Sequence, residues 1–311
     1  MKQKIFNGII ITISIFVLIE LSIQKSLIYS SIMNALCLWV YNLIPSLFPF
    51  FIISDILINY NITSYIPKII KSFCKCIFNI TDNMLTILIL SMISGFPSNA
   101  RNTRTLYDKG LITAEEANHI LMFSHFANPI FILTTIAVFF FHNEKVGVVL
   151  LITHYLSNII LGICLRNKFS YENSIISNQF NYSDFGSVFV TAIKKAVDTI
   201  LTICGIIVVF LMLSTIIINT FKFNIYNQMI IKGIFEITIG IEDLSKMSIG
   251  INYKLVIASM ILAFGGISVH VQVLSQIAGT KIKYIYFFVG RMYQMIIAGT
   301  LTYIWSIFLK I

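Results

Sequence analysis

The chain has 311 residues, of which 57% are hydrophobic and only 11% are charged, whereas a soluble protein has roughly 25% charged residues. This composition excludes a soluble globular protein and a separate soluble catalytic domain. The formal net charge of +9 comes from short basic clusters between apolar runs, a pattern typical of membrane orientation and of anionic lipid headgroups. We therefore expect no nucleic-acid partner, and an all-α, polytopic helical membrane protein of about eight spans embedded in the lipid bilayer.

The first predicted element covers residues 1–25. Lys2 and Lys4 precede an apolar core, Ile5 to Ile19, as in a signal peptide. Residues 18–22 offer no small-x-small cleavage site, so we interpret this stretch as an uncleaved N-terminal transmembrane helix.

An apolar stretch with two prolines, Ser30 to Asn59, comes next and contains one acid, Asp55. Our first interpretation is that Asp55 reaches the membrane surface near Asn59. The alternative is a buried carboxylate inside the helix bundle, which is costly in a membrane and would then be a candidate functional group.

The stretch from Ser91 to Ile132 contains two interruptions. An apolar run stops at residues 94–99, Ser-Gly-Phe-Pro-Ser-Asn, and Arg101 and Arg104 follow. Thr113 and Glu116 have the spacing of a capping box, which predicts a helix start at Thr113. A second apolar run is interrupted at residues 128–129, Asn-Pro. Glycine and proline end helices, and in lipid such breaks survive only where protein or a polar cavity surrounds the freed backbone groups.

The second half of the chain shows the same features. Glu236 lies alone in an apolar run between two glycines, and residues 264–272 interrupt the next apolar run with polar groups at alternate positions. The last apolar run, Tyr284 to Leu309, contains Arg291, a possible structural partner of Glu236. His270 is another possible partner for Glu236, and either residue is a possible carrier of a coupled proton.

Two short matches suggest an internal repeat. Residues 91–96 resemble 259–264, and residues 50–59 resemble 210–219 at a similar offset. We predict two probably inverted repeats, each with a broken or re-entrant helix. The predicted divisions are residues 1–25 for the N-terminal helix, 26–165 for the first repeat, 166–186 for a polar linker loop and 187–311 for the second repeat.

A half-helix that begins inside the membrane presents unpaired N–H groups and a positive dipole end, which suit an anion. Arginine's planar fork suits a carboxylate. Two simpler interpretations stay open: Arg101 and Arg104 mark a cytoplasmic loop, and His270 and Gln272 only satisfy freed backbone groups. The predicted substrate-binding residues are Gly95, Pro97, Ser98, Asn99, Arg101, Arg104, Asn128, Glu236, Gly265, Gly266, Ser268, His270 and Gln272.

No catalytic residue, metal site or cofactor is predicted, because no nucleophile–base pair or metal-ligand cluster stands out in the sequence. Cys74 and Cys76 have the wrong spacing for a metal-binding pair and no nearby histidine. We therefore expect a protein that is not an enzyme. An oligomer remains possible.

Four segments in order resemble one protein family: SGFPSNARNTRTLYDKGLITAEEA, FANPIFI, FEITIG and FGGISVHVQVLSQIAGT. Together they are similar to the sporulation integral membrane proteins of the YlbJ/SpoVV type, within the wider group that has a nucleoside-recognition, or Gate, domain. The resemblance runs from about Ile44 to Tyr303. The chain departs from the family pattern at Asn99, Arg101 and His125-Phe126, and these departures leave the break and the basic charge intact.

The resemblance implies a transporter used in endospore formation, which moves dipicolinic acid across the outer forespore membrane by alternating access. Dipicolinate is a planar dianion with two carboxylates beside a pyridine nitrogen, so it would be the small anionic substrate. Two rivals stay open: a transporter of a nucleoside or another small solute, and a membrane scaffold for spore assembly that transports nothing. An uncharged substrate would tolerate loss of Arg101 and Arg104, whereas a dianion would not.

Overall fold

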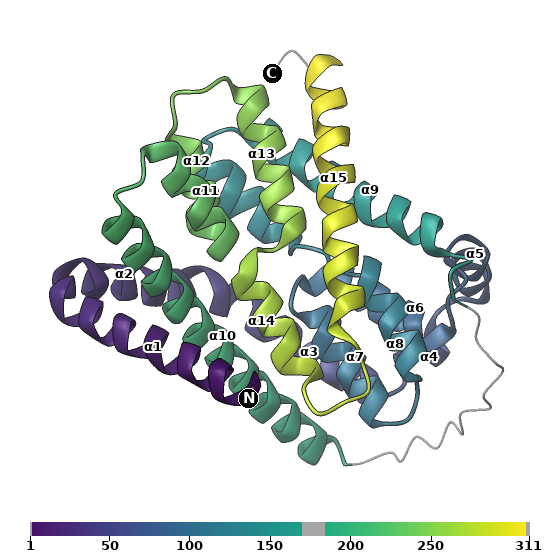
Figure 1. Cartoon of the computed structure of the whole chain (residues 1–311). Coiled ribbons are helices and arrows are strands. Elements are labelled where there is room, and N and C mark those ends of the chain that lie inside the picture. Colours follow the sequence, from purple (N-terminus) through teal and green to yellow (C-terminus); the bar gives the residue numbers. More distant parts are fainter. Residues whose placement is uncertain (1, 170–183, 309–311) are drawn as a thin grey trace.

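A computed structural model describes residues 2–169 and 184–308 (Figure 1). These residues form helices and connecting turns without a strand. The expected all-α fold is therefore confirmed for the described parts of the chain. The helices are α1 (Lys2–Ile23), α2 (Lys25–Leu38), η1 (Trp39–Leu43), α3 (Ile44–Asn59), α4 (Ile62–Tyr65), α5 (Lys68–Phe78), α6 (Asp82–Ser94), α7 (Ser98–Asp108), α8 (Ala114–Phe123), η2 (Phe131–Phe140), α9 (Glu144–Leu165), α10 (Phe185–Phe221), α11 (Ile225–Phe235), α12 (Ile237–Lys246), α13 (Ile251–Phe264), α14 (Gly266–Ile277) and α15 (Tyr284–Phe308).

Among residues 2–169 and 184–308, five helical stretches are long and apolar enough to cross a membrane: Lys4–Ile23, Lys25–Asn59, Glu144–Leu165, Phe185–Phe221 and Ile251–Ile277. A sixth arises if α5 and α6, which are bent by 93° at their junction, are taken as one span. This makes the protein a multi-pass membrane protein. The number is below the roughly eight spans expected, because α7, α8, α11 and α12 have only 10 or 11 residues each, against the roughly 20 that crossing requires.

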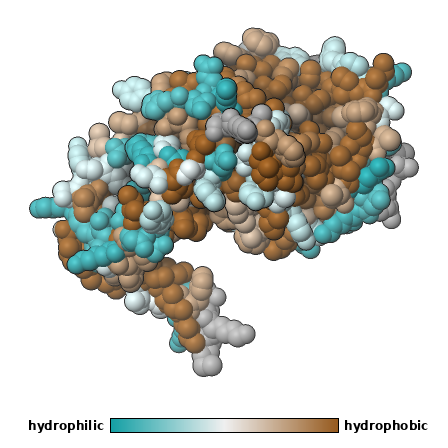
Figure 2. All heavy atoms as spheres, turned by 90° about the horizontal axis from the view of Figure 1, so that it is seen from above, coloured by the Kyte–Doolittle hydropathy of each residue, from teal (hydrophilic) through white to brown (hydrophobic). Residues whose placement is uncertain are grey.

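The outer surface agrees with a membrane location. Seen from above, apolar residues cover broad areas and hydrophilic residues gather in patches (Figure 2). The apolar side chains of α1 are largely exposed, among them Ile5, Leu18 and Ile23 at 57%, 62% and 69%. Apolar side chains exposed to this extent are suited to lipid.

Two pairs of helices form hairpins that open at opposite ends of the molecule (Figure 1). In the lower hairpin, α6 and α7 are joined at their open end, where the Asn83 side chain donates to the Leu111 carbonyl at 2.8 Å. In the upper hairpin, α11 and α12 are joined by an ion pair of 2.6 Å between Lys232 and Asp243. The two hairpins therefore enter the bundle from opposite sides.

Close packing in the upper hairpin depends on two glycines. A Cβ atom on Gly240 would lie only 2.2 Å from the Gly233 Cα, so any side chain at Gly240 would push α11 and α12 apart. These are the glycines that flank Glu236 in the sequence. Their role is to let the two helices approach each other closely on either side of that residue.

The capping box predicted at the start of α8 is confirmed. The Glu116 backbone N–H donates to Thr113 Oγ1 at 3.2 Å, and the Thr113 backbone N–H donates to Glu116 Oε2 at 2.7 Å. The two residues thus pair two N–H groups that the helix start would otherwise leave without an acceptor.

The first interpretation of Asp55 is wrong. Asp55 is 1% exposed and lies inside the bundle on α3, where it forms an ion pair with Arg101 of α7. The partner is 46 residues away in the sequence, and its charge is what makes burial of this carboxylate tolerable.

Part of the predicted linker, residues 170–183 of 166–186, lies outside the described residues. The division of the chain at that loop and the boundaries of the two repeats stay predictions.

Apolar side chains pack in three clusters around the middle of the bundle: one centred on α6 and α8, one on η2, α12 and α13, and one on α2, α3 and α10.

Candidate functional site

Four interruptions of the helices lie in the middle of the bundle. They are residues 95–97 between α6 and α7, residues 124–129 between α8 and η2, Glu236 between α11 and α12, and Gly265 between α13 and α14. All four were expected from the sequence as breaks or as a lone acid beside glycines. The structure adds that the first and third are the tips of the two hairpins.

The four interruptions contact one another in series. A Cβ atom on Gly95 would lie 2.5 Å from the backbone nitrogen of Asn128, so the first and second are in direct backbone contact. The Phe96 ring stacks on His125 with 4.8 Å between centroids. A Cβ on Gly265 would lie 3.2 Å from Nε2 of His125, and one on Gly266 would lie 3.4 Å from the backbone nitrogen of Ile237. The breaks therefore form one continuous region.

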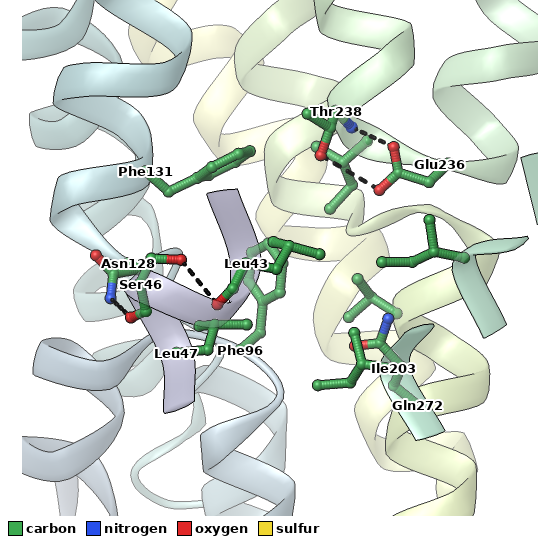
Figure 3. Close-up of a pocket in the computed structure, with 13 residues that line it drawn as sticks. Leu43, Ser46, Leu47, Phe96, Asn128, Phe131, Ile203, Glu236, Thr238 and Gln272 are labelled. Carbon is green, nitrogen blue, oxygen red and sulfur yellow. Dashed lines mark hydrogen bonds between the residues drawn. The ribbon is translucent and has the colours of Figure 1, made fainter. Parts of the chain in front are cut away.

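A closed pocket lies within this region (Figure 3). Its free volume is about 30 Å³, enough for about one water molecule. Asn128 and Ser46 lie on one side of the pocket, and Glu236 and Gln272 lie on the other. The full lining is Leu43, Ser46, Leu47, Phe96, Asn128, Phe131, Ile203, Ile207, Glu236, Ile237, Thr238, Val269 and Gln272.

Asn128 joins three elements at the edge of this pocket. Its side-chain amide donates to the carbonyls of Ser46 at 3.1 Å and Ser94 at 3.3 Å, and its side-chain oxygen accepts from the Ile130 N–H at 2.8 Å. The residue thus supplies hydrogen-bond partners to groups that the breaks in α6 and α8 leave free. Its side chain is 3% exposed and fully engaged in structure.

Glu236 caps the start of α12. Its Oε2 accepts from the backbone N–H of Thr238 at 2.7 Å (Figure 3) and from that of Ile239 at 3.0 Å. The positive end of the helix dipole stabilises this carboxylate, which is 4% exposed and lines the pocket. Within the parts of the chain that the structure describes, no ion pair joins Glu236 to either Arg291 or His270.

His270 satisfies the backbone at the fourth break. One ring nitrogen lies 3.0 Å from the Phe264 carbonyl, the last residue of α13, and the other lies 2.7 Å from the Tyr284 hydroxyl. Pairing freed backbone groups is the simpler of the two roles that the sequence left open for His270, the other being contact with the substrate. Gln272, one turn further along α14 than Ser268, lines the pocket instead.

Arg101 and Arg104 were both predicted to bind the substrate, but their side chains are engaged with acids and backbone carbonyls of the protein. Arg101 is 4% exposed, pairs with Asp55 and donates to the Phe51 carbonyl at 2.9 Å. Arg104 pairs with Asp108 at 2.6 Å and donates to the carbonyl of Ala278 at 2.7 Å. Neither lines the closed pocket. Both line an open cleft at the lower end of the molecule.

Several buried polar groups in this region have no hydrogen-bond partner. At the first turn of α7 these are Ser98 Oγ and both side-chain atoms of Asn99, and at the first turn of α14 the atom is Ser268 Oγ. All three residues are 0% exposed. Buried polar groups are normally paired, so these two helix starts lack partners that a water molecule or a ligand would supply; none of the three residues lines the closed pocket.

The sequence did not single out Ser46 and Thr238, and it misjudged Arg291. Ser46 lies between two prolines, and Thr238 lies two residues after Glu236, so proximity to a helix breaker was the available signal.

Arg291 is 0% exposed and donates to the Met122 carbonyl at 2.8 Å, while its Nε and one terminal nitrogen have no partner. Its neighbours are aromatic and histidine rings rather than a carboxylate.

The fold and the four breaks define a multi-pass integral membrane protein with an interior polar region. Residues 40–144 match a protein-family model described as nucleoside recognition, or Gate, and this match includes the first two breaks. The chain is 27% identical over 303 residues to the sporulation integral membrane protein YlbJ of Bacillus subtilis strain 168, covering 86% of this chain and 74% of that protein. The predicted similarity to sporulation integral membrane proteins of the YlbJ type is thereby confirmed. No solved structure matches the chain.

The described residues contain no group of three or more histidine, cysteine, aspartate or glutamate side chains arranged to hold a metal ion. The polar side chains of the region are instead amides, hydroxyls, the imidazoles of His125 and His270, and the carboxylate of Glu236. Such groups bind and orient a polar molecule through hydrogen bonds.

Proposed function

We propose that this protein is a membrane transporter that moves a small aromatic dicarboxylate, dipicolinic acid, across the outer forespore membrane of a spore-forming bacterium. The observation that carries the proposal is the meeting of four helix breaks around one closed pocket. Discontinuous helices at the middle of a membrane bundle are typical of transporter binding sites. The similarity to a sporulation membrane protein supports the cellular setting.

The pocket must enlarge during the transport cycle. Its free volume of about 30 Å³ does not admit a pyridine ring with two carboxylates. The walls come from both hairpin tips and from α10, so movement of the hairpins relative to α10 would enlarge it. Substrate would bind in a more open state of an alternating-access cycle, in which the pocket is larger than the roughly 30 Å³ of this structure.

An inverted repeat would supply the two alternating states. In chain order, the α6–α7 hairpin, which opens downward, is followed by the broken helix α8–η2 and then by α9. The α11–α12 hairpin, which opens upward, is followed in the same way by the broken helix α13–α14 and then by α15. This order supports inverted repeats in which Gly95 corresponds to Glu236. It does not support the sequence match of residues 91–96 with 259–264, which pairs a hairpin with a crossing helix.

The chemistry of the site favours an anion with hydrogen-bond acceptors. The first turns of α7 and α14 carry the unpaired Ser98, Asn99 and Ser268 side chains, and both turns are positive ends of helix dipoles. Carboxylate oxygens would accept from these hydroxyl and amide groups. Glu236 already occupies the start of α12 and would oppose a second negative charge there.

A nucleoside is the second candidate substrate, because residues 40–144 match a family described as nucleoside recognition. The carboxylate of Glu236 and the amide of Gln272, which line the pocket, suit the hydroxyls of a ribose as well as they suit other polar groups. A nucleoside has no net charge, so its transport would not depend on cations near the path.

Deletion of the gene in the source bacterium tests the proposal. Spore dipicolinate should fall strongly, while dipicolinate should still be made in the mother cell. Restoration by the wild-type gene, and failure of restoration by a Ser98→Ala/Ser268→Ala variant that is present in the membrane at normal amount, would support a transport site. Normal dipicolinate in spores that lack the protein would exclude dipicolinate as its substrate.

A further inference from the structure

An open polar cleft lies at the lower end of the molecule, separate from the closed pocket. Its volume is about 410 Å³, more than ten times that of the pocket. Its walls come from α7 and the residue after it, from α10 and from α14. The lining residues that matter here are Arg104, Lys109, Lys195, Thr202, Ser275 and Gln276.

The cleft leads toward the closed pocket along the same helices. On α10, Thr202 lines the cleft and the next residue, Ile203, lines the pocket. On α14, Gln276 lines the cleft and Gln272, one helical turn or roughly 6 Å away, lines the pocket. The barrier between the two spaces is therefore about one turn of helix thick.

The cleft carries cations whose charges are only partly matched. Arg101 is neutralised by Asp55, and Arg104 by Asp108. The remaining charged groups of the cleft wall are Lys109, directly after α7, Lys195 on α10, and the acid Asp198 on α10.

The positive charge of Lys195 affects the protonation of Lys109. Partial burial lowers the pKa of Lys109, the positive charge of Lys195 lowers it further, and Asp55 opposes these effects. The Lys109 ammonium donates to the neutral side chain of Asn59 at 2.8 Å. An anion held between the two lysines would relieve their repulsion.

We infer that this cleft is an outer binding site for a small dianionic carboxylate, held between Lys109 and Lys195 before it enters the closed pocket. The inference rests on the proposed transport function and extends it with a second site that the sequence did not indicate. Thr202 and Ser275 also line the cleft, but their hydroxyls donate to the carbonyls of Asp198 at 2.8 Å and Gln272 at 2.7 Å, so the two lysines are the groups left to hold the anion. Because the cleft is open to solvent, the lysines capture the anion by charge, while the helix starts inside recognise it by hydrogen bonds.

The test uses the full-length protein in proteoliposomes with labelled dipicolinate, and isothermal titration of dipicolinate onto the purified protein in detergent. The variants are Lys109→Gln, Lys195→Gln and both together. Lys145→Gln, which removes an exposed lysine outside the cleft, is the matched control. Each cleft variant should raise KM and Kd about three- to tenfold with little change in maximal rate, and added salt should reduce the difference from wild type.

The outcomes separate this inference from the proposed function. Saturable dipicolinate transport by the wild type, with KM and Kd unchanged in the double variant, would overturn the outer site and leave the transport proposal standing. No transport by the wild type would overturn the transport proposal. In that case, dipicolinate binding weakened by the two lysine changes would still support the cleft site, and no measurable binding would overturn it as well.

Discussion

The buried pair of Asp55 and Arg101 should dominate the stability of the contact between α3 and α7. The two side chains are 1% and 5% exposed, so solvent screens their interaction little. Asp55→Asn would leave the Arg101 guanidinium buried without a counter-charge. Arg101→Met would do the same to the carboxylate.

Each single change should cost about 3–5 kcal/mol, the range for breaking a buried pair by removing one partner. Asp55→Asn should fall at the lower end, because Arg101 keeps its hydrogen bond to the Phe51 carbonyl at 2.9 Å and its stacking over the Phe51 ring at 5.0 Å. The double variant should cost less than the sum by at least about 2 kcal/mol, because it leaves no unpaired charge.

The assay is reversible unfolding in mixed detergent micelles, followed by fluorescence, for the wild type, both single variants and the double variant. Asp82→Asn is a matched control, because its pair with Lys71 at 3.0 Å is 55% exposed on the acid side and should be worth less than about 1 kcal/mol. If the costs at Asp55 and Arg101 simply add to within about 0.5 kcal/mol, the pair is not the coupled buried contact described above.

Three further changes test other contacts. Gly95→Ala should lower the apparent Tm and impair transport, because the new Cβ would lie 2.5 Å from the Asn128 backbone and because residue 95 has φ of +78°. Normal melting and uptake would contradict the contact between the first two breaks. Thr113→Ala should cost about 1 kcal/mol of unfolding free energy by removing the cap that Glu116 completes, and an unchanged value would show that the box contributes nothing. Arg291→Met should keep or raise the apparent Tm, because it removes a buried charge that has no carboxylate partner. A large loss of Tm would mean that the hydrogen bond from Arg291 to the Met122 carbonyl outweighs the cost of burying the charge.

The class of the protein and the positions of its helix breaks were predictable from the sequence because both depend on local composition. Glycine, proline and a lone Glu236 mark interruptions wherever they occur in an apolar run, and the capping box at Thr113 uses residues only three positions apart. Each of these features appears in the structure at the expected place.

Pairing and direction were not predictable, because they depend on residues far apart in the chain. Arg101 looked free for a substrate until the fold brought Asp55 beside it from α3. A break followed by a short helix has the same local sequence whether the chain crosses the membrane or turns back, so the sequence left open whether each interruption was a broken or a re-entrant helix. The two-lysine cleft joins α7 with α10, across 86 residues, and no local pattern marks it.

The central claim is that the helix starts of α7 and α14, at the first and fourth breaks, bind the transported solute. The most direct measurement is the initial rate of labelled dipicolinate uptake into proteoliposomes that contain the wild type, Ser98→Ala/Ser268→Ala, or the control Ser306→Ala, a buried serine on α15 that bonds only within its own helix. The account predicts saturable uptake by the wild type and the control, and at least a tenfold lower kcat/KM in the double variant. Equal uptake by the double variant and the wild type, or wild-type uptake no greater than that of empty liposomes, would contradict it.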